Sequence, residues 1–218
     1  MNYLTLVNSV LRRLREAEVA SVSTNSYSKL VGDFVNDAKR MVEDSWDWSG
    51  LRDTKTVTTS DGTQEYTLTG VDHSFKLLDA NNDTSNGRLQ HQSQAWLNNN
   101  TVLNDAATGV PSNFIWSGNN GSPDYNATVK LYPTPDGVYS LKFDVVDRTP
   151  VFTHDTNDTV SVPSAPIIAY ALALAARERG ETGGASSQEL YSIADACLAD
   201  AIAMDAARFP TETIWYAV

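Results

Sequence analysis

The sequence predicts an α+β protein: a bundle of four helices, two N-terminal and two C-terminal, with an inserted antiparallel β domain and an extended C-terminal tail. Three patterns lead to this fold class. Near both ends of the chain, apolar residues recur every three or four positions, which is typical of amphipathic helices. In the middle the period falls to two, which is typical of strands with one wet face. The last ten residues, FPTETIWYAV, are rich in apolar side chains, although chain ends are usually polar.

Residues 1–51 are expected to form the N-terminal helix pair. Tyr3 begins a run of apolar residues at helical spacing, and arginines close this run, where the negative end of a helix dipole favours cations. The same period continues over residues 27–42, with Asn25 as the N-cap of the second helix. After this helix, Gly50 allows the chain to turn.

Residues 52–160 are expected to form the β insertion. Short runs alternate between apolar and polar residues, and turn signals rich in Asp, Asn, Pro or Gly separate them. Alternation of this kind places one face of an antiparallel sheet on a core and the other in water. Three strand pairs are predicted: residues 56–60 with 66–68, 75–80 with 88–92, and 129–132 with 139–145.

Helical spacing returns over residues 161–208, the predicted C-terminal helix pair. The first helix, capped by Ser164, is apolar on nearly every side and should therefore be buried. The second begins at Ser187 and carries an apolar stripe. Neither helix pair can bury its stripe alone, so the two pairs should form one bundle. The other side of the last helix is expected to be an acidic face of Asp195, Asp200 and Asp205.

The composition limits the classes of function. The net charge of −11 and the pI near 4.6 argue against a protein that wraps nucleic acid, because neutralising phosphates needs clustered Lys and Arg. An acidic wall would repel DNA and let it slide through a duct. Cys197 lies in an apolar stripe and is expected to be a buried, inert thiol. No secretory signal or membrane span is predicted, so we expect a protein made in a cytoplasm.

No catalytic, cofactor or metal site is predicted, and we expect no enzyme activity. His73, His91 and His154 lack the spacing that places two imidazoles on one metal ion. The sequence also lacks a glycine-rich phosphate loop and a G-x-S-x-G nucleophile elbow. The alternative from another class is a carbohydrate-binding or hydrolytic module, in which Trp96 and Trp116 stack on sugar rings.

The C-terminal tail, residues 209–218, is the candidate binding element. Burying one of its large side chains is worth roughly 1.5–3 kcal/mol, which exceeds the entropy cost of ordering the segment only where the fit is good. The tail either folds back onto its own chain or docks on a partner, and an added strand on another subunit's sheet is one such mode. The candidate docking residues are Phe209, Ile214, Trp215, Tyr216 and Val218.

Three stretches of the chain resemble the head-to-tail adaptor, or connector, proteins of tailed bacteriophages. They are YLTLVNSVLRRLREAEVASV near the N-terminus, VNDAKRMVEDSWDWSGLR at the end of the second helix, and DAARFPTETIWYAV at the C-terminus. The resemblance extends to the adaptors of short-tailed phages and the related tail tubular protein A. It covers nearly the whole chain, and its motifs are packing motifs without catalytic content.

This resemblance implies a structural virion protein at the head-tail junction, made in the host cytoplasm. Such a protein forms a homo-oligomeric ring, a dodecamer, below the portal protein and connects the portal to a tail or nozzle protein. DNA passes transiently and without sequence preference through its central channel. By this analogy the acidic helix face lines the channel, the sheet domain faces outward or toward the tail, and the C-terminal tail reaches the portal.

Overall fold

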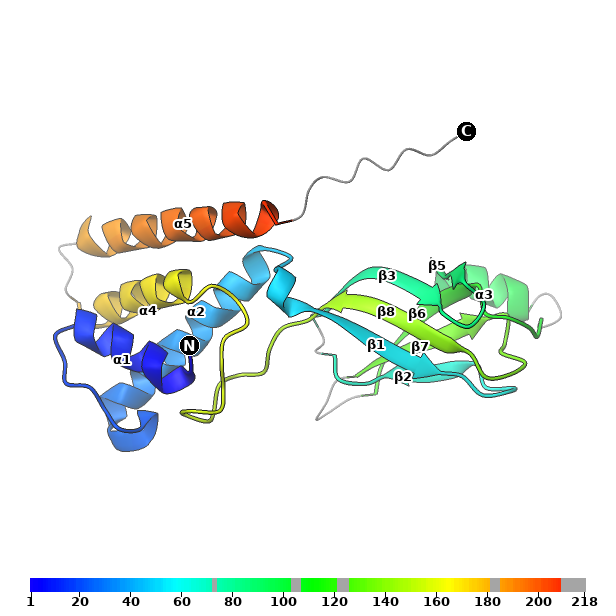
Figure 1. Ribbon diagram of the computed structural model, residues 1–218, viewed down its shortest axis with the longest axis horizontal. Coiled ribbons are helices and arrows are strands. Elements are labelled where there is room, and N and C mark those ends of the chain that lie inside the picture. Colours follow the sequence, from blue (N-terminus) through cyan, green and yellow to red (C-terminus); the bar gives the residue numbers. More distant parts are fainter. Residues whose placement is uncertain (72–73, 103–106, 121–125, 181–184, 209–218) are drawn as a thin grey trace. The chain divides into compact units, whose positions relative to one another are not determined.

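The computed structural model describes residues 1–71, 74–102, 107–120, 126–180 and 185–208. The chain divides into two compact units (Figure 1). The helical unit combines Met1–Leu51 with Thr149–Val218, and the sheet unit is Arg52–Arg148. The segment from Thr149 to the next helix therefore lies with the helices.

Four α-helices form the described part of the helical unit, together with two 3₁₀ turns that precede and follow the second helix. Helices α1, α2 and α4 pack against one another, and α5 lies along α4 (Figure 1). The bounds are α1 (Tyr3–Arg13), η1 (Val22–Thr24), α2 (Ser26–Ser45), η2 (Ser49–Leu51), α4 (Ser164–Glu178) and α5 (Ala185–Ala206).

Side-chain caps fix the starts of the first two helices. Asn2 caps α1 by accepting a hydrogen bond from the backbone nitrogen of Thr5 at 2.9 Å. The predicted N-cap of α2 is confirmed. Asn25 Oδ1 accepts a hydrogen bond from the backbone nitrogen of Ser28 at 2.7 Å. In return, Ser28 Oγ accepts one from the backbone nitrogen of Asn25 at 3.1 Å, which completes a capping box. The prediction for α4 is wrong: Ser164 is its first residue, and the cap position is Pro163 without a side-chain bond.

The helical core follows the predicted spacing in α1, α2 and α4. Because residues three, four and seven apart share one side of a helix, α1 and α2 each bury a stripe. Helix α4 is buried on several sides, since it packs against α1, α2 and α5. The most deeply buried side chains are Leu6, Val7 and Val10 of α1, Val31, Val35, Ala38 and Val42 of α2, and Ile167, Ala171, Ala173 and Ala175 of α4.

The predicted four-helix bundle is wrong. Helices α1, α2 and α4 form the core, whereas α5 is an outer layer on α4. The predicted α5 stripe consists of Leu190, Ala194, Cys197, Leu198, Ala201 and Ile202, of which only Ala194 and Ala201 are buried. Outside the stripe, the large side chains of Ile193 and Met204 are 61% and 74% exposed. Small buried side chains let α5 lie close to α4, but they bury too little apolar surface to complete a bundle.

The sheet unit contains two four-stranded sheets and one helix in its described residues. The strand orders are β1-β8-β3-β4 and β2-β7-β6-β5. The bounds are β1 (Arg52–Thr58), β2 (Glu65–Leu68), β3 (Lys76–Asn82), β4 (Gly87–Arg88), β5 (Gln90–His91), α3 (Gln94–Thr101), β6 (Asn113–Asn119), β7 (Ala127–Tyr132) and β8 (Ser140–Val146).

The inserted domain is therefore not the single antiparallel sheet of hairpins that was predicted. Strands β1 and β2 lie in different sheets, as do β7 and β8, and β5 pairs with β6 in parallel. Of the three predicted pairs, only β3 with β4 forms a ladder, at Asn81↔Arg88 and Asn82↔Gly87. The other two connections carry hairpin-like turn residues but cross from one sheet to the other.

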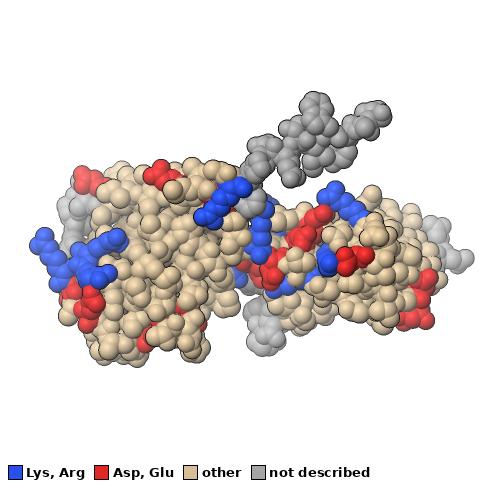
Figure 2. Space-filling view, in the orientation of Figure 1, with Lys and Arg blue, Asp and Glu red and all other residues tan. Residues whose placement is uncertain are grey.

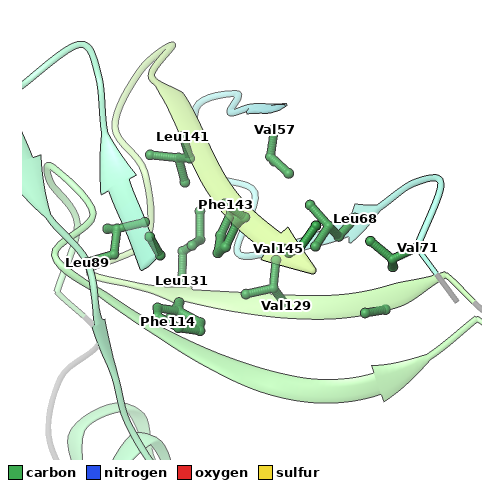
Figure 3. Packing of buried hydrophobic residues seen from close by; sticks show 12 residues of the cluster. Val57, Leu68, Val71, Leu89, Phe114, Val129, Leu131, Leu141, Phe143 and Val145 are labelled. Carbon is green, nitrogen blue, oxygen red and sulfur yellow. The ribbon is translucent and has the colours of Figure 1, made fainter. Parts of the chain in front are cut away.

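One apolar cluster fills the space between the two sheets (Figure 3). Leu141, Phe143 and Val145, which alternate along β8, are fully buried as their period-two pattern indicates. They pack with residues of the second sheet, and the rings of Phe114 and Phe143 meet edge to face with centroids 5.6 Å apart. The cluster joins strands from both sheets into a sandwich.

A buried ion pair fixes the point where the chain returns to the helical unit. Lys39 Nζ donates to Glu43 Oε2 at 3.2 Å and to the carbonyl oxygens of Thr149 at 2.6 Å and Pro150 at 3.0 Å. Thr149 Oγ1 also donates to Glu43 Oε1 at 2.6 Å. Lys39 and Glu43 are only 3% and 5% exposed. Since both charges are partnered, this network holds the residues after the sheet unit on α2.

We expect Lys39→Met to lower the free energy of unfolding by about 3–5 kcal/mol, because it leaves the Glu43 carboxylate buried without its cation. Adding Glu43→Leu should recover much of that loss, since no charge then remains buried. Lys29→Met, on the exposed surface of the same helix, is the matched control. Urea unfolding followed by circular dichroism measures all three variants. Equal stability of the Lys39→Met and Lys29→Met proteins would contradict the assignment.

Candidate interaction surface on the helical unit

A groove of about 550 Å³ lies along the C-terminal half of α5. One wall is a single side of α5, continued by Arg208, two residues beyond the end of the helix. The opposite wall is the segment that leads into α4, and the floor is the turn between α2 and η2. The lining residues are Trp48, Ser49, Gly50, Ser161, Val162, Pro163, Ala165, Pro166, Cys197, Asp200, Ala201, Met204, Asp205 and Arg208.

The floor depends on one close backbone approach. Trp48 is 1% exposed, and its Nε1 donates to the carbonyl oxygen of Val42 at 2.7 Å, so the indole closes the end of α2. At Gly50 the chain passes so near the opposite wall that an added Cβ would lie 2.1 Å from the carbonyl oxygen of Ser161. Glycine is therefore required here by space, since only a residue without a side chain permits such contact.

The lining is mostly apolar, with charges at its edge. Val162 and Pro166 are buried beneath the wall, whereas Met204 projects from α5 with 74% of its surface exposed. Asp200 and Arg208 are the exposed charged residues of the groove. An exposed apolar hollow with a polar edge is typical of a surface that receives side chains of another polypeptide segment.

The three aspartates of α5 do not form one continuous face. Residues five positions apart are turned by about 140° from one another around a helix. Asp195 accepts a hydrogen bond from Tyr170 Oη of α4, and Asp205 is buried. Asp200 is exposed at the groove. In Figure 2 the acidic side chains over α5 stand singly, without gathering into a patch.

Two of these aspartates attach α5 to its neighbours. The carboxylate of Asp205 accepts two hydrogen bonds from Ser49, one from the backbone nitrogen at 3.0 Å and one from the hydroxyl at 2.6 Å. These bonds attach the end of α5 to η2. Burial alone would raise the pKa of Asp205, but the hydrogen bonds from Ser49 and the charge of Arg208 hold it below its usual value. Burial, with the bond to Asp195, raises the pKa of Tyr170 to about 12.

The tryptophans proposed for sugar stacking are engaged within the sheet unit. Trp96 of α3 meets the ring of Tyr132 edge to face, with centroids 5.1 Å apart. Trp116 of β6 packs against Phe75 at 5.2 Å and Phe114 at 5.5 Å. Both indoles therefore contribute to packing of the sandwich.

Other residues singled out from the sequence lie apart from the groove or outside the described part of the chain. His91 packs on Phe114, and His154 lies beside Asp158. Within the described residues, no three His, Cys, Asp or Glu side chains are grouped as a metal site would require. His73 and the docking residues of the tail fall outside the described residues: Phe209, Ile214, Trp215, Tyr216 and Val218.

The groove itself was not predicted. Its lining comes from three stretches, near residue 48, near residue 163 and from 197 to 208, which the periodicity of any one helix does not connect. The available signals were local: a glycine directly after a tryptophan-rich helix end, and two prolines at the start of an apolar helix. Neither signal identifies its partner in the other stretch.

None of the helices in the described ranges has the length and apolar character needed to cross a bilayer.

An apolar groove with a polar edge is typical of a binding surface, for another protein, a membrane or a smaller ligand. The family model for the SU10 adaptor protein matches residues 1–213, and the chain belongs to this family. The match confirms the resemblance to phage head-to-tail adaptors and supports a structural role as a bacteriophage adaptor in the virion. A search of the curated proteins found no match.

Asp205→Ala should lower the free energy of unfolding by about 1–3 kcal/mol, because it leaves the backbone nitrogen of Ser49 without its partner. Asp200→Ala, at an exposed position of the same helix, is the matched control and should be near neutral. Hydrogen exchange of α5 amides should be faster in the Asp205→Ala protein. Equal exchange in the two variants would mean that the Ser49 contact does not hold α5.

The same contact predicts a pH dependence. Because the folded-state pKa of Asp205 is lowered from 3.8, its stabilising contribution is complete above that pH and is lost as the pH falls through the lower folded value. The stability difference between wild type and Asp205→Ala should therefore shrink only below pH 3.8. Unfolding curves at a series of acid pH values measure it, and a difference that vanishes at neutral pH would contradict it.

Proposed function

We propose that the chain is a head-to-tail adaptor that assembles as a ring below the portal protein and connects it to a tail or nozzle protein. The observation that carries this proposal is the family match over residues 1–213. The exposed Met204 of α5 adds support, because an apolar side chain on an outer helix offers surface to a neighbouring copy. The ring is a dodecamer located at the head-tail junction of the virion, after synthesis in the host cytoplasm.

The C-terminal tail is the docking element in this proposal. It attaches each copy to the portal or to a neighbouring subunit. Individual docking contacts need only be weak, because a ring presents many tails together and the later contacts are effectively intramolecular. The residues that dock are Phe209, Ile214, Trp215, Tyr216 and Val218.

DNA passes through the centre of the ring in this proposal. The net charge of −11 supports a channel to which phosphates do not adhere. Asp195 and Asp200 are exposed and are therefore the candidates for the channel wall, although Asp195 also accepts a hydrogen bond from Tyr170. Asp205 is buried against Ser49 and is not a candidate.

Ring formation and tail docking are tested together with purified portal protein. Native mass spectrometry and negative-stain imaging should show a ring of twelve copies on the portal. Deletion of residues 210–218 should leave the circular dichroism spectrum unchanged and abolish attachment, because four of the five docking residues are lost. The double variant Thr211→Ala/Thr213→Ala is the control and should attach normally. Full attachment of the deleted chain would contradict the role of the tail, and absence of any ring on the portal would contradict the adaptor function.

Asp200→Lys should slow DNA release from assembled particles, because it places a cation where phosphates pass. Asp61→Lys, an equal change of charge in an exposed turn of the sheet unit, is the control. Single-particle ejection kinetics at low and high salt provide the measurement, and the delay should weaken at high salt. Unchanged kinetics in particles with intact rings would exclude Asp200 from the channel wall.

A further inference from the structure

We propose that the groove beside α5 receives the C-terminal tail of a second copy of this chain. The inference rests on the proposed ring and identifies the neighbouring subunit's receptor for the tail. The occupant is the segment FPTETIWYAV, residues 209–218, which begins directly after Arg208, itself a lining residue of the groove. Each copy then gives one tail and accepts another.

The chemistry of the groove fits this segment. The lining is mostly apolar, with Met204 exposed on one side and prolines on the other, and the tail offers Ile214, Trp215 and Tyr216 as anchors. Aromatic anchors placed in apolar pockets carry most of the binding energy at protein interfaces. The hollow therefore suits the tail's side chains.

The charges at the edge are compatible with the tail. The only charged side chain of the tail is Glu212. The Arg208 side chain is 69% exposed, and its contacts with Asp205 at 3.6 Å and Ser49 at 3.5 Å are long. Arg208 of the receiving copy can thus turn toward Glu212 of the incoming tail. Asp200 stands on the same edge and would disfavour any tail register that brings Glu212 next to it.

The position of the groove favours a tail from another copy over the chain's own tail. The groove lies beside the last turns of α5, so the chain's own tail would have to reverse its direction immediately after Arg208. The segment contains no Gly, Asn, Asp or Ser; Pro210 is its one residue that is common in tight turns, and it also favours an extended conformation of Phe209 before it. Its Thr, Ile, Trp, Tyr and Val favour an extended strand.

The length of the tail limits how far from its own copy it can bind. Ten residues in extended form span about 33–36 Å. If each copy passes its tail to the next copy instead of exchanging tails within a pair, the contact is head to tail, and repeated contacts of this kind close into a ring when the rotation between copies permits. The exchange thus agrees with a cyclic assembly.

The chain contains its own probe of the groove. Cys197 is the single cysteine of the sequence, it lines the groove, and it is partly exposed. The rate at which a maleimide labels Cys197 therefore reports whether the groove is filled. In the full-length protein the labelling rate should fall about tenfold when the concentration is raised from one at which copies are separate to one at which they associate. A tenfold fall corresponds to about ten filled grooves for each empty one.

A mixing experiment identifies the copy that supplies the tail. The full-length Trp215→Ala chain carries an intact groove and a weakened tail, so its Cys197 should stay reactive at all concentrations. Adding a full-length Cys197→Ser chain, which has an intact tail and no thiol, should slow that labelling about tenfold. Protection of the wild-type thiol that does not change with dilution would overturn the proposal in favour of the chain's own tail, and absence of protection in every mixture would overturn it altogether.

Two exposed residues of α5 provide a matched pair that tests the groove. Met204 lines it and is 74% exposed, whereas Ile193 is 61% exposed on the same helix and is not a lining residue. Met204→Glu should abolish the concentration-dependent protection of Cys197. For each variant, the labelling rate at high concentration is compared with the labelling rate of the same variant in dilute solution. Ile193→Glu should leave the protection intact. Equal loss in both variants would mean that the whole helix surface, and not the groove, mediates the contact.

The outcomes separate this inference from the proposed function. Rings on the portal in which Cys197 remains fully reactive would overturn the groove contact while leaving the adaptor role intact. Protection of Cys197 by the Cys197→Ser chain, with no ring formed on the portal, would support the groove contact and contradict the proposed function. Circular dichroism and thermal unfolding of each variant confirm that the fold is retained.

Discussion

The ammonium group of Lys39 sets the constraint from which the rest of the helical unit follows. A buried ammonium is tolerated only while its hydrogen-bond partners stay in place, so Thr149 and Pro150 have one position on α2. From there Asn36 continues the attachment, donating to the carbonyl oxygen of Phe152 at 3.2 Å and accepting from its backbone nitrogen at 2.9 Å. Polar pairing thus determines how two distant parts of the sequence share one core.

The outer helix is held in a different way. Where α1, α2 and α4 are joined by fully buried apolar side chains, α5 rests on alanines and on two hydrogen-bonded carboxylates, those of Asp195 and Asp205. Contacts of this type fix the position of a helix while leaving its large apolar side chains free for other partners. The groove exists because α5 lies close to its neighbours at a few points and stands away from them elsewhere.

Local patterns in the sequence predicted what local physics controls. The stripes of α1 and α2, the cap at Asn25 and the buried alternation of β8 all depend on residues a few positions apart. Strand pairing depends on which sheet a turn leads to, and the alternation of Leu141, Phe143 and Val145 is the same in either sheet. The family resemblance was confirmed because it rested on long packing motifs.

The groove depends on pairs of residues far apart in the sequence, such as Ser49 with Asp205 and Gly50 with Ser161. Neither member of such a pair carries a signal of its partner, so a single sequence does not reveal it. The aspartates of α5 illustrate the same limit. Their acidity was evident from the sequence, but whether each one meets solvent or a hydroxyl group was decided by α4 and η2.

The sheet unit begins and ends at one place, since Arg52 at the start of β1 is the register partner of Val146 at the end of β8. An insertion whose two ends are neighbours does not force the two chain segments that flank it apart. Evolution can therefore enlarge, trim or exchange this sandwich as one unit while the helices keep their own geometry unchanged.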